Sequence, residues 1–167
     1  QFTHVAEYQG RLVAENIGKP GKRSRTKKAD YRVVPWVTFT DPEVARVGMT
    51  EAESAGRGGR VAYLPMTEVD RAVVAGQTRG FVKLVAGPKL VLGQTGGGRL
   101  LGATVVAARG GEMIHEAALA IRTGMFTGRL AQTVHAYPTW SLAIQKAASQ
   151  FFVEVDGRRA YPARSEP

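Results

Sequence analysis

The pattern of hydrophobic and polar positions predicts one early helix, then mostly strands, and then mostly helices. Runs of apolar, β-branched or alternating residues predict strands at residues 33–39, 45–49, 60–65, 80–85, 90–94 and 100–107. Apolar residues that recur at spacings of three and four predict helices at residues 3–17, 112–123, 127–133 and 139–152. Strands followed by helices indicate an α+β fold, with an antiparallel β-sheet and helices packed on one face.

Two short motifs add a further helix and a turn to this pattern. Thr50 and Glu53 have the spacing of a capping box, which predicts a short helix that Gly56 ends. The three glycines at 96–98 predict the turn of a hairpin between the last two strands. We do not expect them to bind phosphate, because no helix begins directly after them.

Residues 135–139, His-Ala-Tyr-Pro-Thr, are the strongest candidates for chemistry. An aromatic residue before a proline, followed by a hydroxyl residue and a helical pattern, is typical of a tight turn that leads into a capped helix. We expect Thr139 to be the N-cap. His135 and Tyr137 would then lie on a loop fixed between a proline and a buried helix, where reactive side chains are often found. His115, among apolar residues of a predicted helix, is expected to be structural.

Composition limits the class of protein. A chain of 167 residues with 44% hydrophobic content can form one domain with its own core. The absence of cysteine excludes a disulfide, a thiolate nucleophile and a Cys-ligated metal within the chain, and we expect no metal site. No apolar run reaches the ~18 residues of a membrane span, and no secretory leader is present, so we expect a cytoplasmic location without membrane contact. The chain begins at Gln1 within a helical pattern, and we interpret it as a fragment of a longer protein.

The net charge of +9 is concentrated in one segment. Residues 19–32 contain seven basic residues and one acidic residue, a balance of +6. We interpret this run as a solvated loop. The alternative is a polyanion-binding segment, because clustered Lys and Arg are typical of phosphate contact. The chain has no nucleic-acid-binding motif, so nucleic acid is not an expected partner.

Several stretches, in chain order, resemble one known family. They are VVPWVTFTDPEVARVG at 33–48, DRA at 70–72 with GFVKL at 80–84, LGA at 101–103, GEMI at 111–114 with AALA at 117–120, and HAYPT at 135–139. They resemble the C-terminal dimerisation domain of the pyridine-nucleotide-disulfide oxidoreductases, the flavoprotein family of dihydrolipoamide dehydrogenase and mercuric reductase. The resemblance implies a homodimer that uses FAD and NAD(P)H. It also implies FAD and NAD(P) domains that this sequence lacks, so the chain alone is expected to bind no cofactor and to be inactive.

The resemblance divides the chain into four parts. Residues 1–18 correspond to the end of a helix of the flavin domain, and residues 19–32 are the basic loop. Residues 33–155 form the dimerisation domain. Residues 156–167 are a polar tail, which we expect to fray.

The resemblance also points to a chemical difference in the loop. In the dehydrogenases the motif reads His-x-His-Pro-Thr-x-x-Glu, and the second His is the acid/base. Tyr137 and Leu142 stand at the places of that His and its Glu. An imidazole with a pKa near ~6.5 can deprotonate a dithiol at neutral pH, whereas a phenol with a pKa near ~10 cannot without a large shift. Mercuric reductases carry a Tyr here, but they also end in a cysteine pair, which this chain lacks.

We therefore expect an acceptor other than a simple dithiol, reached through a loop that completes the active site of the partner subunit. Tyr137 is the first candidate catalytic residue, as a hydrogen-bond donor or as a surface for a flat acceptor such as a quinone. The alternative is that its hydroxyl only tethers the loop. His135, as a base in a shifted position, is the second candidate. By resemblance the Tyr137–Pro138 bond is expected to be cis, with the hydroxyl protruding and without a partner in its own chain.

The expected cofactor-binding residues are Thr3, His4 and Pro138. Thr3 and His4 resemble a helix opening that in the family contacts the flavin ring, although they also suit a plain helix start. Two other functions remain open. One is a conventional dihydrolipoamide or disulfide reductase, which Tyr137 and Leu142 disfavour. The other is a stand-alone basic binding module that uses residues 19–32.

Overall fold

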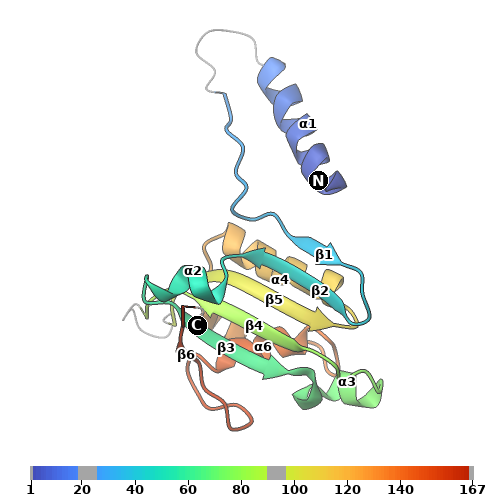
Figure 1. Ribbon diagram of the computed structural model, residues 1–167, viewed down its shortest axis with the longest axis vertical. Coiled ribbons are helices and arrows are strands. Elements are labelled where there is room, and N and C mark those ends of the chain that lie inside the picture. Colours follow the sequence, from blue (N-terminus) through green and yellow to red (C-terminus); the bar gives the residue numbers. More distant parts are fainter. Residues whose placement is uncertain (1, 19–25, 90–96, 166–167) are drawn as a thin grey trace.

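The computed structural model describes residues 2–18, 26–89 and 97–165, and its centre is an antiparallel sheet (Figure 1). Within this described part the sheet has six strands in the order β1-β2-β5-β4-β3-β6. The strands are β1 (Trp36–Thr38), β2 (Glu43–Gly48), β3 (Arg60–Pro65), β4 (Phe81–Ala86), β5 (Leu100–Ala107) and β6 (Tyr161–Pro162).

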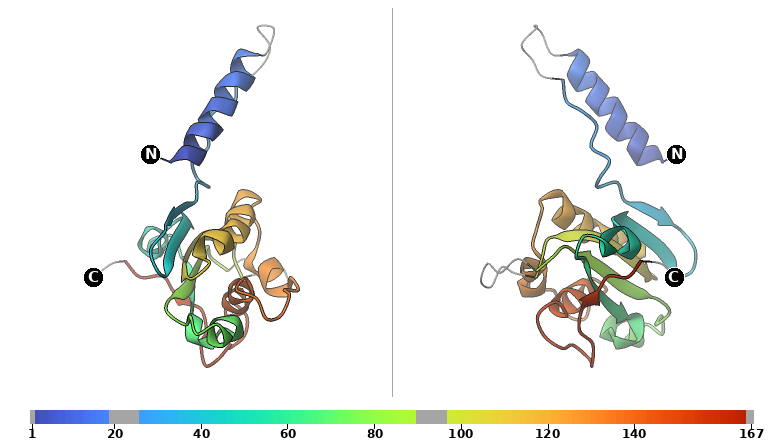
Figure 2. Two further views of the ribbon diagram at one scale, coloured as in Figure 1. Left: turned by 90° about the vertical axis from the view of Figure 1, so that its right-hand side faces the viewer. Right: turned by 60° about the vertical axis from the view of Figure 1, so that its left-hand side comes forward.

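Helices α4, α5 and α6 lie together on one face of this sheet (Figure 2). The helices are α1 (Thr3–Ile17), α2 (Glu51–Ala55), the 3₁₀ helix η1 (Met66–Glu68), α3 (Asp70–Val74), α4 (Gly110–Arg122), α5 (Thr127–Gln132) and α6 (Leu142–Ser149). The α+β fold with an antiparallel sheet, predicted from the sequence, is confirmed.

The core lies between the sheet and these three helices. Strand residues two apart point to the same face, and the register Ala45↔Val105 sets the buried side chains of β2 and β5 next to each other. Helix α4 adds Ile114 and α6 adds Ile144, both fully buried. Burial of an aliphatic side chain of this size stabilises the fold by roughly 1.5–3 kcal/mol. The alternating apolar side chains of the strands therefore largely determine which face of the sheet the helices cover.

The capping box at α2 is present as predicted. The Thr50 hydroxyl accepts a hydrogen bond from the Glu53 amide at 3.0 Å, and the Glu53 carboxylate accepts one from the Thr50 amide at 2.6 Å. Gly56 is the C-cap of the helix. The predicted cap at Thr139 is wrong, because α6 begins three residues later and the Thr139 hydroxyl donates to the Ala136 carbonyl at 2.7 Å.

The expected strand at 90–94 lies outside the described residues. β5 pairs with β4 in the register Phe81↔Val106. The tail does not fray as expected. Tyr161 pairs with Val61, which makes β6 an edge strand of the sheet.

Helix α1 stands apart from the core, and none of its residues is buried (Figure 1). A few polar contacts join it to the extended segment that follows. The His4 ring lies 2.8 Å from the Pro35 carbonyl oxygen, and the Tyr8 hydroxyl accepts a bond from the Asp30 amide at 2.8 Å. Among the described helices, none is both long enough and apolar enough to cross a bilayer.

Candidate functional site

The candidate site is the loop between α5 and α6, where the sequence predicted reactive residues. The Tyr137–Pro138 peptide bond is cis, as expected, and so is Asp41–Pro42. Tyr137 is 70% exposed, and Pro138 is exposed beside it. The loop therefore exposes the phenol of Tyr137 on the surface of the domain.

The Tyr137 hydroxyl is influenced by a carboxylate of its own chain, which was not predicted from the sequence. The carboxylate of Asp70, the first residue of α3, raises the pKa of the Tyr137 hydroxyl by hydrogen bonding and by its negative charge. A neutral phenol can donate a hydrogen bond to a carboxylate, whereas a phenolate cannot. The environment thus favours the protonated hydroxyl, so Tyr137 has even less phenolate at neutral pH than a free tyrosine.

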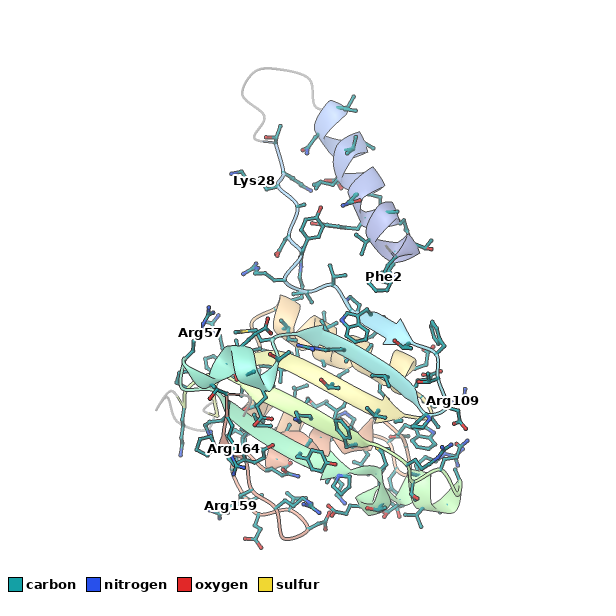
Figure 3. The ribbon with its side chains drawn as sticks, in the orientation of Figure 1. Phe2, Lys28, Arg57, Arg109, Arg159 and Arg164 are labelled. Atoms are coloured by element: carbon teal, nitrogen blue, oxygen red, sulfur yellow. The ribbon has the colours of Figure 1, made fainter. Side chains whose placement is uncertain are left out.

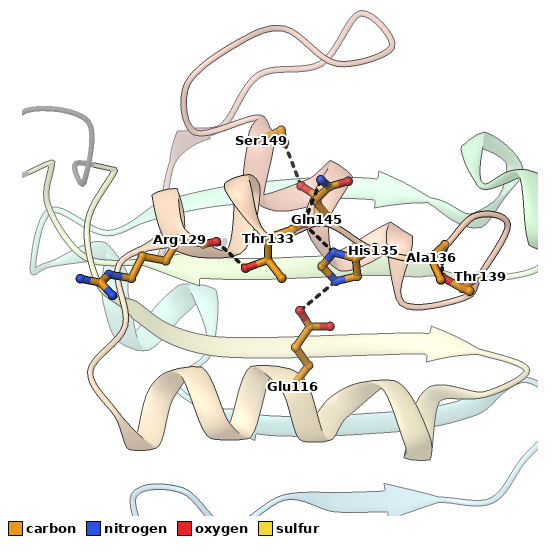
Figure 4. Close-up of polar contacts among 8 residues, drawn as sticks. All are labelled: Glu116, Arg129, Thr133, His135, Ala136, Thr139, Gln145 and Ser149. Atoms are coloured by element: carbon orange, nitrogen blue, oxygen red, sulfur yellow. Dashed lines mark hydrogen bonds and ion pairs between the residues drawn. The ribbon is translucent and has the colours of Figure 1, made fainter.

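His135 points the opposite way, into the domain. Its side chain is 8% exposed, and its Nε2 lies 2.9 Å from Oε1 of Glu116 on α4 (Figure 4). This imidazole–carboxylate pair was not predicted from the sequence, because the resembled motif places its carboxylate at the position of Leu142. One signal was available: Glu116 precedes the buried Ala117 and follows the buried Met113 by three residues, at the margin of an apolar helix face.

The Thr133 carbonyl is the centre of the polar network behind the loop. It accepts hydrogen bonds from the Nδ1 of His135 at 2.9 Å and from the Gln145 side-chain amide at 3.1 Å. Glu116 belongs to α4, Thr133 follows α5, and Gln145 lies on α6 (Figure 4). The network therefore ties three helices to the loop that carries Tyr137.

Thr3 and His4, the other predicted site residues, lie elsewhere in the chain. Both are exposed at the start of α1, where the His4 ring stacks on Phe2 at a centroid distance of 5.3 Å (Figure 3). Phe2 provides no side-chain cap, and its carbonyl accepts only from the Val5 and Ala6 amides, so the Thr3 and His4 amides remain available as donors. These donors suit the electron-rich edge of a reduced flavin. Among the described residues, no hydrogen bond, ion pair or ring contact joins Thr3 or His4 to the 135–138 loop.

The described part of the basic run is largely paired within the chain. Lys27 lies 2.6 Å from Glu15, and Arg32 contacts both carboxylate oxygens of Asp30 at 2.9 and 2.8 Å. The pKa of Asp30 is well below its usual range, mainly because Arg32 donates these hydrogen bonds. A hollow of about 910 Å³ beside this segment is lined by four arginines, but it shares no residue with the 135–138 loop. Residues 19–25 lie outside the described part of the chain.

The fold and the loop define the class. The family profile "Pyridine nucleotide-disulphide oxidoreductase, dimerisation domain" matches residues 34–148, and this chain belongs to that family.

Two curated proteins show the range of relatives. The chain is 39% identical over 156 residues to a mercuric reductase of Streptomyces lividans, covering 92% of this chain and 31% of that protein. It is 36% identical over 152 residues to a dihydrolipoyl dehydrogenase of Corynebacterium glutamicum, covering 89% of this chain and 30% of that protein. The chain thus spans about a third of the length of these relatives.

Solved structures agree with this assignment. LpdA from Mycobacterium tuberculosis superposes with a TM-score of 0.75 at 27% identity, covering 91% of this chain and 31% of that one. The HOCl-induced flavoprotein disulfide reductase RclA from Escherichia coli gives 0.73 at 28% identity, covering 89% of this chain and 32% of that one.

Proposed function

We propose that this chain is the dimerisation domain of an FAD-dependent NAD(P)H oxidoreductase, and that its 135–138 loop completes the active site of the partner subunit. The observation that carries the proposal is the exposed phenol of Tyr137, directly before Pro138, on a loop that three helices hold. A side chain that is 70% exposed on a fixed loop is suited to contact a neighbouring subunit. The protein would act as a homodimer, in which each loop serves the other subunit.

Only a few residues of this chain could contact a flavin. FAD, when bound, would pass electrons from NAD(P)H to the acceptor. The first-turn amides at Thr3 and His4 are the donors in this chain that could face its ring, and Pro138 would face the ring of the partner subunit. Most of the FAD and NAD(P)H pockets would come from other domains, because in the described residues no strand leads through a Gly-x-Gly-x-x-Gly loop into a helix N-terminus. We expect the chain alone to be colourless and inactive.

The acceptor is proposed to be something other than a simple dithiol. Because Asp70 raises the pKa of Tyr137, the hydroxyl is protonated at neutral pH and can donate a hydrogen bond but cannot remove a thiol proton. The phenol has one O–H donor, so a flat acceptor with carbonyl oxygens, such as a quinone, would accept that hydrogen bond in place of Asp70 and stack on the ring. This is the chemistry that the loop supports best.

The Glu116–His135 pair keeps a conventional dihydrolipoamide or disulfide reductase as a second candidate. Imidazole beside a carboxylate is the usual acid/base combination for thiol chemistry. Against it stands the position of His135, which is 8% exposed and faces α4 rather than the surface that Tyr137 occupies. The stand-alone basic module is less well supported, because Glu15 and Asp30 neutralise the paired cations Lys27 and Arg32.

The test uses Tyr137→Phe in the full-length protein, with the two half-reactions measured by stopped-flow absorbance of the flavin. Flavin reduction by NADH or NADPH should be unchanged, and reoxidation by 1,4-benzoquinone should slow roughly tenfold, the effect of one lost hydrogen bond of about 1.4 kcal/mol. Tyr161→Phe, on the edge strand β6, is the control. An unchanged reoxidation rate would reduce Tyr137 to a loop tether. Rapid reoxidation by lipoamide that is lost in His135→Asn would favour the second candidate.

A further inference from the structure

The Glu116–His135 pair is a partly buried polar feature that the proposed chemistry of Tyr137 does not use. The Glu116 side chain on α4 is 28% exposed, and the His135 side chain on the loop is 8% exposed. Burial of two ionisable groups is unfavourable unless they are paired and hydrogen bonded. The cost of burying this pair beside the 135–138 loop suggests that it has a specific function there.

The partners of the imidazole fix where its hydrogens lie. Nδ1 faces the Thr133 carbonyl oxygen, which can only accept, so Nδ1 carries a hydrogen. Nε2 faces Oε1 of Glu116, so one further proton lies between the ring and the carboxyl group. Both ring nitrogens are therefore engaged, and His135 has no free lone pair with which to act as a base toward a substrate.

The same loop then carries two side chains with opposite roles. His135 is held inside by α4 and by the end of α5, while Tyr137, two residues later, is exposed. Gln145 of α6 shares the Thr133 carbonyl with His135, so the anchor reaches both ends of the connection. Rotation of the ring would break two hydrogen bonds at once, which restricts the backbone directly before Tyr137.

We propose that Glu116 and His135 are positioning residues that act through Tyr137, a role that rests on the proposed function of the loop. The pair holds the backbone so that the phenol meets the acceptor in one orientation. In this proposal His135 does not act as a base. Together with Glu116 it anchors the 135–138 loop. Because small displacements of a reacting group cost much of its effect on rate, loss of the anchor should reduce the contribution of Tyr137.

The kinetic test is a double-mutant cycle in the full-length protein. Glu116→Ala should slow flavin reoxidation by 1,4-benzoquinone by up to the roughly tenfold loss expected for Tyr137→Phe, with flavin reduction unchanged. In the Tyr137→Phe background, Glu116→Ala should have no further effect. Glu116→Gln keeps an acceptor oxygen at the same place and should recover part of the rate. Glu112→Ala, on the exposed side of α4, is the matched control.

Independent effects of the two substitutions on reoxidation would overturn the proposal, since residues acting through one another cannot be additive. A second readout separates it from the proposed function. If Tyr137→Phe alone changes no rate, the proposed function fails, but the anchor is still tested by the NMR signal of ¹³Cζ-labelled Tyr137. A broadened or shifted signal in Glu116→Ala and His135→Asn supports the anchor, and an unchanged signal in both variants overturns it.

Discussion

Gln150, at the end of α6, binds both backbone polar groups of Tyr63 on β3. The Gln150 side-chain oxygen accepts from the Tyr63 amide at 3.1 Å, and its side-chain nitrogen donates to the Tyr63 carbonyl at 3.0 Å. β6 pairs with β3 only at Arg60 and Val61. The amide of Gln150 therefore takes the place that a longer edge strand would have occupied at Tyr63.

This relationship predicts a stability effect at a polar residue that is only 2% exposed. Gln150→Ala should lower the free energy of unfolding by about 1–3 kcal/mol, because it leaves the Tyr63 amide and carbonyl without partners. Urea denaturation followed by circular dichroism would measure the change. Gln132→Ala, at the exposed end of α5, is the control, and equal effects of the two substitutions would contradict the assignment.

Asp70→Asn should lower the pKa of Tyr137 toward the ordinary value of a tyrosine. The substitution removes the carboxylate whose hydrogen bond and charge favour the protonated phenol. Titration of ¹³Cζ-tyrosine signals would follow the change, with Tyr137→Phe used to assign the resonance. Asp41→Asn, which removes a surface partner of Arg79, should leave the Tyr137 titration unchanged. An unaltered pKa in Asp70→Asn would show that Asp70 does not control the hydroxyl.

The chain should dimerise through the face that carries the 135–138 loop. Val134 is 92% exposed beside this loop and Val153 is 53% exposed beyond α6, and such apolar surface is typical of an interface. Analytical ultracentrifugation should show a dimer, and Val134→Asp should raise its dissociation constant about tenfold or more. Ile17→Asp, at the exposed end of α1, should have little effect. A monomer throughout the micromolar range would count against this interface.

The capping box of α2 should make a pH-dependent contribution to stability. The pKa of Glu53 is lowered, first by the hydrogen bond from the Thr50 amide. A carboxylate with a lowered pKa in the folded state stabilises the fold above its unfolded pKa, and this contribution disappears as the pH falls through the folded value. The stability difference between the wild type and Glu53→Gln should therefore shrink on acidification, as urea titrations at several pH values would show.

Loss of the Thr50 hydroxyl tests the other half of the same cap. Thr50→Ala should cost about 1 kcal/mol of unfolding free energy at neutral pH, the usual effect of losing an N-cap side chain. Thr67→Ala, at an exposed position of η1, is the control. Equal stabilities of Thr50→Ala and the wild type would show that the cap hydrogen bond contributes nothing measurable.

Much of the fold could be predicted from the sequence, because most of its elements depend on local pattern. Strand β3 at Arg60–Pro65 and strand β5 at Leu100–Ala107 have the bounds that their alternating residues predicted. The capping box was readable because both of its hydrogen bonds join residues three apart. The motif before α6 likewise pointed to the loop and to Tyr137.

The contacts that join distant parts of the chain were decided by the tertiary structure. Glu116 reaches His135 over 19 residues, and Gln150 reaches Tyr63 over 87 residues. No local period encodes such pairs, because they form only once α4 and α6 have packed over the buried face of the sheet. The sequence by itself determined most of the elements, the family and the exposed phenol, whereas packing alone determined which carboxylates lie near Tyr137 and His135.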